Sequence, residues 1–305
     1  MSFSSDTKIQ LCKVKMDETS TKKAEMYGLL LFSKEFSVDS ISLSTENRSV
    51  CNLLVDMLAE LDGVIVDVTT RLYSRGKKDK LFKIEVPDQN DRRKILSDFG
   101  HEDSRINLRI NRGNLEFDEQ IAAFLRGAFL SCGYITDPGY GYNIEFCVPF
   151  MHLANDLVKL ISDIEHLNIR VSITNRKGMF VIYIRGSEDV TDLLAYIGAN
   201  KAAMDTMQVK MLKEVRNYIN RTNNFETANI SKTVNASTSQ IEAIKRIKTK
   251  KGIDWLPENL REIAQLRLDN PELSLKELSE LLSYPISRSG VNHRIKRILE
   301  ISETL

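Results

Sequence analysis

The sequence predicts an α+β protein in which a duplicated αββαββα domain precedes a small all-α domain that ends in a helix-turn-helix. Three observations support this fold class. The same order of helices and strands begins near Met26 and again near Leu125, which indicates an internal repeat. Every apolar pattern that we find beyond residue 200 has helical spacing. The length of 305 residues suggests two domains, and 42% hydrophobic with 28% charged residues is normal for a globular chain.

The predicted elements divide the chain into four parts. These are an N-terminal extension at 1–20, the duplicated domain at 21–200 with copies at about 21–100 and 118–200, a connecting helix or linker at 201–222, and the helix-turn-helix domain at 223–305. The first copy contains MYGLLLFSK, the strand Ser37–Thr45, the helix Asn47–Leu61, the strands GVIVDVTTRLY and LFKIEVP, and a closing helix before Gly100. The second contains LRGAFLSCG, the strand Tyr142–Val148, the helix HLANDLVKLISDIEHL, the strands IRVSIT and MFVIYIR, and a closing helix before Gly198. Alternating or β-branched runs mark the strands, and the turns SRGKKDK and NRKG separate the later pairs.

The first helices of the two copies align on small residues. Gly28 falls on Gly127, and Ser33 falls on Cys132. This arrangement resembles the duplicated LAGLIDADG fold of homing endonucleases. The resemblance implies that the two helices pack side by side at a pseudo-dyad, with small residues allowing close approach, and that the strands form two saddle-shaped sheets that can lie over DNA. Two ordinary buried apolar helices would give a similar pattern.

The resemblance also locates the positions at which such nucleases hold divalent metals. Paired carboxylates near the ends of the motif helices bind the ions that activate water. Here those positions are Ser33 and Cys132, and the other acidic slot of each motif is Leu31 or Leu130. None of these side chains is a carboxylate. We therefore expect a catalytically inactive scaffold with no catalytic residue, metal or cofactor.

Two displaced acids keep an enzymatic alternative open. Glu35 and Asp137 lie near the motif helices but are not matched between the copies, so we assign them to turns. The alternative is a metal-dependent endonuclease that uses these two residues as displaced ligands. The segment GYGY at 139–142 lacks the lysine and the strand-to-helix context of a P-loop, which favours a hairpin turn.

The connecting region has helical patterns and a basic charge. An amphipathic helix that packs against one of the domains is predicted over Asn200–Arg221, with apolar positions at Met204, Met207, Met211, Val215 and Ile219. Residues 219–233 are rich in Asn and Thr, which favour caps and turns, so this segment is a structured hinge or touches DNA. Residues 201–252 hold 11 Lys or Arg and 4 Asp or Glu. Such a cluster of cations would attract the phosphates of a nucleic acid, although a solvated linker would have the same composition.

The segment Leu273–Ile298 predicts two short helices around a tight turn. Ser274 and Glu277 have the spacing of a capping box, which starts the first helix. Its apolar face is predicted to contain Leu275, Leu278, Leu281 and Leu282. Tyr284-Pro285 then stops the helix because proline lacks an N–H and restricts the residue before it.

The second helix restarts at Ser287 and is expected to carry a polar, basic face. Val291, Ile295 and Ile298 fall on one side. Between Ile286 and Leu299 there are four Lys or Arg and no acid. An Arg side chain can form two hydrogen bonds with guanine, and an Asn side chain can form two with adenine. These residue types therefore suit a helix that reads DNA bases. An ordinary surface helix with a solvated basic face is the alternative. Gly290 is a poor helix former, and close backbone approach to DNA is one reason to tolerate it.

At this point a second resemblance becomes specific. ISRSGVNHRIKRI, the upstream segments Leu256–Arg267 and Asn224–Thr233, and the opening Ser2–Leu11 are similar to the WhiA family of bacterial sporulation and cell-division regulators. The resemblance covers essentially the whole chain. It implies a sequence-specific DNA-binding transcription regulator involved in cell division, chromosome segregation and, in sporulating bacteria, sporulation. Double-stranded DNA is the expected partner, and another transcription regulator is a further candidate.

We expect the DNA-binding residues to lie mainly in Ser274 to Leu299. The candidates there are Lys276, Ser287, Arg288, Ser289, Asn292, His293, Arg294, Lys296 and Arg297. Further candidate phosphate contacts are Arg221, Lys232, Lys245, Arg246, Lys248, Lys250 and Lys251. A third hypothesis makes the N-terminal domain a module that senses a partner or ligand and is coupled to DNA binding.

The remaining composition argues against a secreted, disulfide-bonded or membrane protein. The four cysteines contain no CxxC pair, and the four histidines have no ligand-like spacing: Cys12, Cys51, Cys132, Cys147, His101, His152, His166 and His293. No secretory segment or membrane span is found. We therefore expect a cytoplasmic, nucleoid-associated protein without a membrane partner.

Overall fold

The predicted duplication is present as two antiparallel four-stranded sheets with the same topology. Their strand orders are β1-β2-β4-β3 and β5-β6-β8-β7. The computed structural model describes residues 2–75, 77–101 and 108–305. The chain divides into two units, Met1–Lys213 and Glu214–Leu305, which we call the N-terminal and C-terminal domains. The α+β fold class is therefore confirmed.

The elements of the N-terminal domain follow the repeat. The first copy contains α2 (Thr19–Leu31), β1 (Glu35–Phe36), β2 (Ile41–Thr45), α3 (Arg48–Met57) with a π-helical continuation (Leu58–Asp62), β3 (Asp67–Arg75), β4 (Lys77–Glu85) and α4 (Gln89–Asp98). A 3-10 turn (Arg112–Asn114) precedes the second copy, which contains α5 (Asp118–Cys132), β5 (Gly133–Ile135), β6 (Asn143–Val148), α6 (Met151–Ser162), β7 (Val171–Arg176), β8 (Met179–Arg185) and α7 (Ser187–Tyr196).

Two predicted strands of the first copy are shorter in the structure. Ser37 and Ser40 close a turn before β2, because the Ser40 main-chain N–H donates to the Ser37 hydroxyl and the Ser37 N–H donates to the Ser40 carbonyl. Gly63 adopts a left-handed conformation after the π-helix, so β3 begins only at Asp67. The predicted turn SRGKKDK is wrong at the described residues on both sides of Gly76, because β3 continues to Arg75 and β4 begins at Lys77. Gly76 itself lies outside the described residues.

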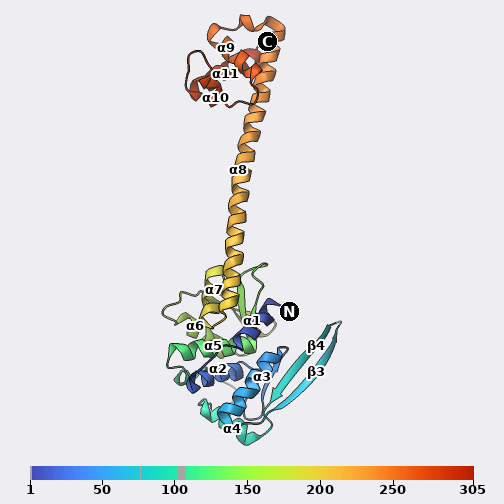
Figure 1. The fold of residues 1–305 in the computed structure, drawn as a ribbon, viewed down its shortest axis with the longest axis vertical. Helices are drawn as coiled ribbons and strands as arrows, with labels where there is room; N and C mark the ends of the chain where they lie inside the picture. Colours follow the sequence, from blue (N-terminus) through green and yellow to red (C-terminus); the bar gives the residue numbers. More distant parts are fainter. Residues whose placement is uncertain (1, 76, 102–107) are drawn as a thin grey trace. The chain divides into compact units, whose positions relative to one another are not determined.

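The core of the N-terminal domain is organised around α2 and α5, which pack side by side (Figure 1). A Cβ added to Gly28 would lie 2.2 Å from the Phe124 main-chain oxygen, and one added to Gly127 would lie 2.1 Å from that of Glu25. Each glycine therefore meets the carbonyl three residues before the other glycine. This reciprocal contact is the pseudo-dyad that the resemblance implied, and it requires glycine at both positions.

The predicted N-terminal extension is part of this domain. Residues Phe3–Leu11 form helix α1, which Ser2 caps by accepting a hydrogen bond from the Ser5 N–H. Leu11 is buried in the core. The Ser4 hydroxyl accepts a hydrogen bond from the Ile135 N–H of β5. Burial of one apolar side chain and a link to the second sheet hold this segment against the domain.

Helix α8 differs most from the sequence prediction. It is one continuous helix, Asn200–Lys251, so the Asn- and Thr-rich segment at 219–233 is helical and residue 222 is not a break in the backbone. Thr233, Thr238 and Ser239 donate their hydroxyl protons to carbonyls four residues earlier in the helix. These bonds satisfy side chains that would otherwise compete with the backbone.

The apolar side chains of α8 also behave differently from the prediction. Met204, Met207, Met211, Val215 and Ile219 were expected to pack against a domain, but they are 49–65% exposed. The packing prediction is therefore wrong at these five positions. Instead, small side chains near the start of α8 enter the N-terminal core, namely Ala202 and Ala203.

The C-terminal domain has a small core of its own. It contains the last part of α8, a 3-10 turn (Ile253–Trp255), α9 (Glu258–Asp269), α10 (Leu275–Glu280) and α11 (Arg288–Glu303). Figure 1 shows α9, α10 and α11 gathered in this domain. Its buried cluster includes Ile244, Ile247, Ile263 and Ile295, and Ile295 was expected there from its helical spacing with Val291 and Ile298. Among the described residues, no helix is long and apolar enough to cross a membrane.

Candidate nucleic-acid interface

The first helix of the predicted helix-turn-helix begins with the expected capping box. The Ser274 hydroxyl accepts from the Glu277 N–H at 3.3 Å, and a Glu277 carboxylate oxygen accepts from the Ser274 N–H at 2.7 Å. The hydrogen bond from the Ser274 N–H to the carboxylate holds the pKa of Glu277 below its usual value. The two bonds satisfy two N–H groups that the first turn cannot pair internally, so the start of α10 is confirmed.

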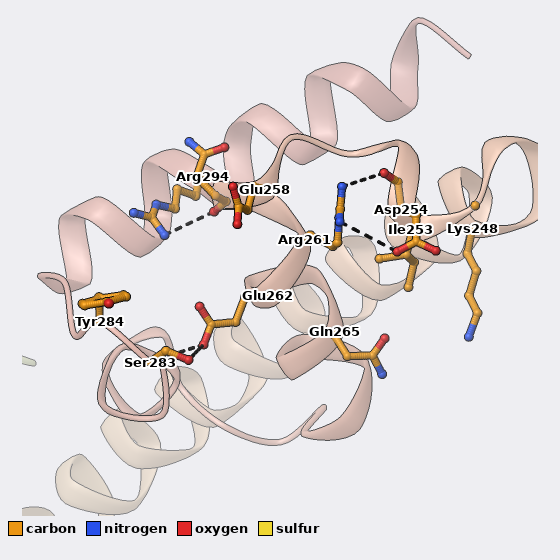
Figure 2. A pocket seen from close by; sticks show the side chains of 12 residues that line it. Lys248, Ile253, Asp254, Glu258, Arg261, Glu262, Gln265, Ser283, Tyr284 and Arg294 are labelled. Carbon is orange, nitrogen blue, oxygen red and sulfur yellow. Dashed lines mark hydrogen bonds and ion pairs between the residues drawn. The ribbon is translucent and has the colours of Figure 1, made fainter.

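The end of α10 is fixed by a residue that the sequence did not identify. The Glu262 carboxylate on α9 accepts hydrogen bonds from both the Ser283 N–H and the Ser283 hydroxyl, each at 2.7 Å (Figure 2). The chain leaves the helix after Glu280. Leu282 is buried, but Leu281 is 52% exposed. The predicted apolar face is therefore wrong at Leu281, because the early end of the helix changes the direction of that side chain.

The contact between Glu262 and Ser283 predicts a pH-dependent contribution to stability. Hydrogen bonds from Ser283 hold the pKa of Glu262 below its ordinary value, so the native state favours the ionised carboxylate. A group with a lowered native pKa stabilises the fold above its unfolded pKa, and that contribution disappears as pH falls through the native pKa. Thermal melts of wild type and Glu262→Gln should therefore differ near neutral pH and converge towards about pH 3. A constant difference across this range would contradict the assignment.

The second helix presents the predicted polar face to solvent. Ser287 caps α11 by accepting a hydrogen bond from the Gly290 N–H at 3.2 Å. Val291, Ile295 and Ile298 are buried. Seven of the sequence-predicted residues around this helix are exposed: Ser287, Arg288, Ser289, Asn292, His293, Lys296 and Arg297. The burial of one side thus leaves a donor-rich surface on the other, which ends where the Arg297 guanidinium pairs with Glu300 at 2.8 Å.

Two residues of α11 have contacts within the domain. A Cβ at Gly290 would lie 3.3 Å from Cδ1 of Ile286, so packing in the turn gives a reason for this glycine besides approach to DNA. Arg294 is only partly exposed, and its guanidinium donates to the Asn259 carbonyl at 3.2 Å (Figure 2). The structure therefore places Arg294 on the flank that faces α9 and separates it from Arg288 and Asn292.

A large open cavity lies on that flank. It measures about 1270 Å³ and includes Arg294, Tyr284 and side chains from α9. Figure 2 shows acidic and basic groups together around it, with Arg261 next to Asp254. Acidic groups on several sides make this cavity less suited to a polyanion than the exposed face of α11.

The candidate phosphate contacts lie along α8. Lys245, Arg246, Lys248, Lys250 and Lys251 are all exposed near its carboxyl end, where cations are favourable to the helix dipole. The Lys250 ammonium donates to the main-chain oxygen of Leu305. Arg221 and Lys232 are also exposed. These side chains are accessible to an anionic partner, with Lys250 already engaged in one contact.

A second cavity brings together three of the predicted DNA-binding residues. It measures about 430 Å³ and is lined by Lys232 from α8, Lys276 from α10 and Arg288 from α11. We call it the basic pocket. Arg267 of α9 also lines it and is fully buried, with its guanidinium donating to the Leu273 carbonyl at 2.6 Å. Burial holds the pKa of Arg267 below its ordinary value. The sequence did not identify Arg267 because its spacing in α9 does not reveal the loop that surrounds it.

Ser33 and Cys132, which the sequence resemblance aligned with metal carboxylates, both have local structural contacts. The Ser33 hydroxyl donates to the Glu35 carbonyl at 3.1 Å. Cys132 is the last residue of α5. Burial raises the pKa of its thiol to about 12. Lys8 of α1 lies beside it and donates to the Leu130 carbonyl at 3.0 Å. The sequence missed Lys8 because α1 lies outside the repeated pattern.

The two displaced acids differ in local structure: Glu35 lies in strand β1, so its assignment to a turn is wrong, whereas Asp137 lies in a turn. A Glu35 carboxylate oxygen accepts from the Ser40 hydroxyl at 2.6 Å and from the Ser42 hydroxyl at 2.9 Å. These bonds lower the pKa of Glu35. Asp137 accepts from the Gly139 N–H at 2.8 Å, in the turn that joins β5 and β6. In the described part of the chain, no three His, Cys, Asp or Glu side chains form a group that could hold a metal ion.

Comparisons with known proteins agree with both halves of this architecture. Residues 121–216 match the model of the WhiA LAGLIDADG-like domain, and residues 219–302 match that of the WhiA C-terminal HTH domain. The chain is 39% identical to the probable cell division protein WhiA of Thermoanaerobacter sp. (strain X514), covering 100% of this chain and 98% of the relative. Identity to the protein of that name from Clostridium botulinum is 35%, over 100% and 99% of the two chains.

A solved structure gives the same result at the level of the whole chain. The crystal structure of full-length DUF199/WhiA from Thermatoga maritima has a TM-score of 0.60 and 26% sequence identity, covering 100% of this chain and 99% of that one. Similarity in sequence and in structure thus extends from end to end. This chain belongs to the WhiA family.

Proposed function

We propose that this protein is a sequence-specific DNA-binding transcription regulator. The observation that carries the proposal is the exposed face of α11 from Arg288 to Arg297, which contains no acid and is oriented by a capped start and a buried opposite side. The name of its relatives, probable cell division protein, supports a role in cell division. Chromosome segregation and sporulation are finer proposals that follow from the family resemblance.

The proposed binding mode places α11 in the major groove. Arg288 and Asn292 lie one helical turn apart, so both can face the same stretch of base edges. Lys296 continues that direction one turn later. Lys245 and the other cations near the end of α8 would contact phosphates, which position a protein on DNA without reading its sequence. Another transcription regulator as a protein partner is a further proposal.

We propose that the N-terminal domain binds DNA or serves as a scaffold, and that it does not cut DNA. The resemblance to homing endonucleases assigns Ser33 and Cys132 to the metal-carboxylate positions. The Glu35 carboxylate accepts hydrogen bonds from Ser40 and Ser42, and the Asp137 carboxylate stabilises a turn. A carboxylate already engaged in two short hydrogen bonds would have to release them to bind a metal. Mg²⁺-dependent nicking of DNA that disappears in Glu35→Gln or Asp137→Asn would overturn this part of the proposal.

Genome-wide mapping of occupied sites tests the regulatory function directly. Chromatin immunoprecipitation should give discrete peaks that share one sequence motif and lie near promoters. The motif should then be bound by the purified protein in preference to shuffled DNA. Uniform occupancy across the chromosome, with no preferred motif, would contradict sequence-specific regulation.

The basic end of α8 predicts a change in salt dependence. Each lost phosphate contact should reduce the slope of log affinity against log salt by about 1. The double variant Lys245→Ala, Lys248→Ala should therefore reduce that slope by about 2. It should weaken binding to specific and to nonspecific DNA by similar factors. Fluorescence anisotropy across a salt series measures both quantities. The control is Lys159→Ala, an exposed lysine on α6; an equal slope change there would show that the effect is not local.

A further inference from the structure

Strand β3 has one edge that no other described strand covers. It lies at the end of the order β1-β2-β4-β3, and among the described residues it pairs with β4 alone. Figure 1 shows β3 and β4 extending away from the helices of the N-terminal domain. All residues from Asp67 to Leu72 are exposed, and neither proline nor glycine interrupts this segment. Such an edge offers main-chain N–H and C=O groups to another strand.

The corresponding edge of the other sheet is less open and has charges of one sign only. Strand β7 ends the order β5-β6-β8-β7. Its residues Val171 and Thr174 are partly buried, and the Arg176 guanidinium lies 3.5 Å from a carboxylate oxygen of β6. Strand β7 contains no acid, whereas β3 contains both Asp67 and Arg71. Of these two edges, only β3 carries charges that complement each other across a pair of identical strands.

The spacing of these charges selects one register for two copies of β3. If Thr69 lies opposite Thr69 of a second, antiparallel copy, Asp67 of each copy lies opposite Arg71 of the other. Both charge pairs and the threonine pair fall on one face, because alternate residues of a strand share a face. On the other face, Val68 of each copy lies opposite Thr70 of the other. Opposite-charge, threonine and β-branched pairs are favourable across antiparallel strands.

Neighbouring registers lose this complementarity. A pairing whose centre moves by one residue leaves both charged side chains without an opposite charge. One whose centre moves by two residues places two Asp67 or two Arg71 side chains opposite each other, which is unfavourable. The register centred on Thr69 also brings Leu72, which is 69% exposed, opposite Val66 and so removes apolar surface from water. Charges and apolar contacts thus favour the same register.

We propose that two copies of this protein associate through their β3 edges, in an antiparallel register centred on Thr69. The four-stranded sheets that contain β3 then join into one continuous sheet with a two-fold axis at Thr69. A second copy is the partner that the charges favour, because β3 supplies both members of each ion pair. The contact covers one strand edge, so we expect weak association in the micromolar to submillimolar range. It depends on β3 and does not depend on the proposed DNA-binding function.

Sedimentation velocity on the full-length protein without DNA tests the association. Wild type should shift from the mass of one chain towards that of two as its concentration rises from micromolar to several hundred micromolar. Asp67→Arg and Arg71→Asp should each raise the dissociation constant about tenfold or more, because each turns both ion pairs into like-charge contacts. The double variant Asp67→Arg, Arg71→Asp restores opposite charges and should associate like wild type. The matched control is Asp192→Arg, the same charge reversal at an exposed position of α7, which should leave association unchanged.

A crosslinking experiment tests the register. Thr69→Cys should form a disulfide between copies on mild oxidation, because directly opposed residues of antiparallel strands lie within reach of one. Thr70→Cys should not, because its counterpart in the second copy is a diagonal neighbour at about 7–8 Å. Non-reducing gels measure the yield. Wild type gives the background, since its exposed Cys147 is free.

Each contrary result overturns the proposal in a different way. A mass of one chain at several hundred micromolar excludes self-association, and association that neither charge reversal weakens excludes β3 as the interface. Better crosslinking of Thr70→Cys than of Thr69→Cys excludes the register. If the charge reversals change DNA affinity in anisotropy but leave the mass unchanged, β3 contacts DNA instead of a second copy. If the protein binds no specific DNA, the proposed function fails and the mass measurement still decides the association.

Discussion

Replacing Gly28 with alanine should destabilise the N-terminal domain by about 3 kcal/mol, at the upper end of the usual cost of overpacking. The added Cβ would lie 2.2 Å from the Phe124 main-chain oxygen and 2.9 Å from the Ala128 nitrogen. Both atoms are backbone, so no side-chain rotation can relieve the contact and the two helices must separate. Differential scanning calorimetry should show the N-terminal transition lowered by about 10 °C.

The position that is equivalent by pseudo-symmetry should respond in the same way. A Cβ at Gly127 would meet the Glu25 oxygen at 2.1 Å. The control is Gly141→Ala, because the space around a Cβ at Gly141 is open within 4 Å; its effect should be within about 0.5 kcal/mol. Equal melting of Gly28→Ala and Gly141→Ala would show that α2 and α5 do not approach as closely as the structure indicates.

Arg288→Ala and Asn292→Ala should each weaken binding of specific DNA by about 1–3 kcal/mol, or roughly fivefold to more than a hundredfold. Both side chains are exposed on α11, so their removal should leave the melting temperature nearly unchanged. Binding to shuffled DNA should change less in Asn292→Ala, because an asparagine contributes no charge to nonspecific attraction. Anisotropy with the mapped motif and with a shuffled sequence measures the difference.

Two arginines provide the comparison. Arg294→Ala should lower the melting temperature of the C-terminal domain, because it removes the hydrogen bond to Asn259, and it should affect specificity less than Arg288→Ala. Arg93→Ala, at an exposed position of α4, should leave specific affinity unchanged. A larger loss of specificity in Arg294→Ala than in either Arg288→Ala or Asn292→Ala would move the base-reading surface to the other flank of α11.

Local patterns predicted most of the fold because they report on short-range physics. Ser274 and Glu277 form a capping box from residues three apart, and Val291 with Ile295 marks the buried side of α11 by helical spacing. Strand β8 was equally clear, since it begins and ends at the predicted residues. Where side chains bond within one helical turn or along one strand, the order of residues is sufficient.

Composition was misleading where helix context changed the role of a side chain. Asn and Thr suggested turns in the middle of α8, but Thr233 and its neighbours bond to carbonyls within the helix. Apolar spacing at Met204 and Val215 suggested a packed face, although spacing alone does not show whether a partner surface exists. Periodicity identifies a helix face; it does not identify what covers that face.

The sequence by itself determined the duplicated domain, the small helical domain, the glycines at the motif helices and the residue types on the face of α11. Tertiary structure decided which of those residues act together. It placed Arg294 against Asn259, brought Glu262 to Ser283, and assembled the basic pocket from four helices. These contacts join residues that are far apart in the chain, and their distances depend on how helices pack. No local pattern encodes that packing, because each helix specifies its own buried face but not the neighbour that meets it.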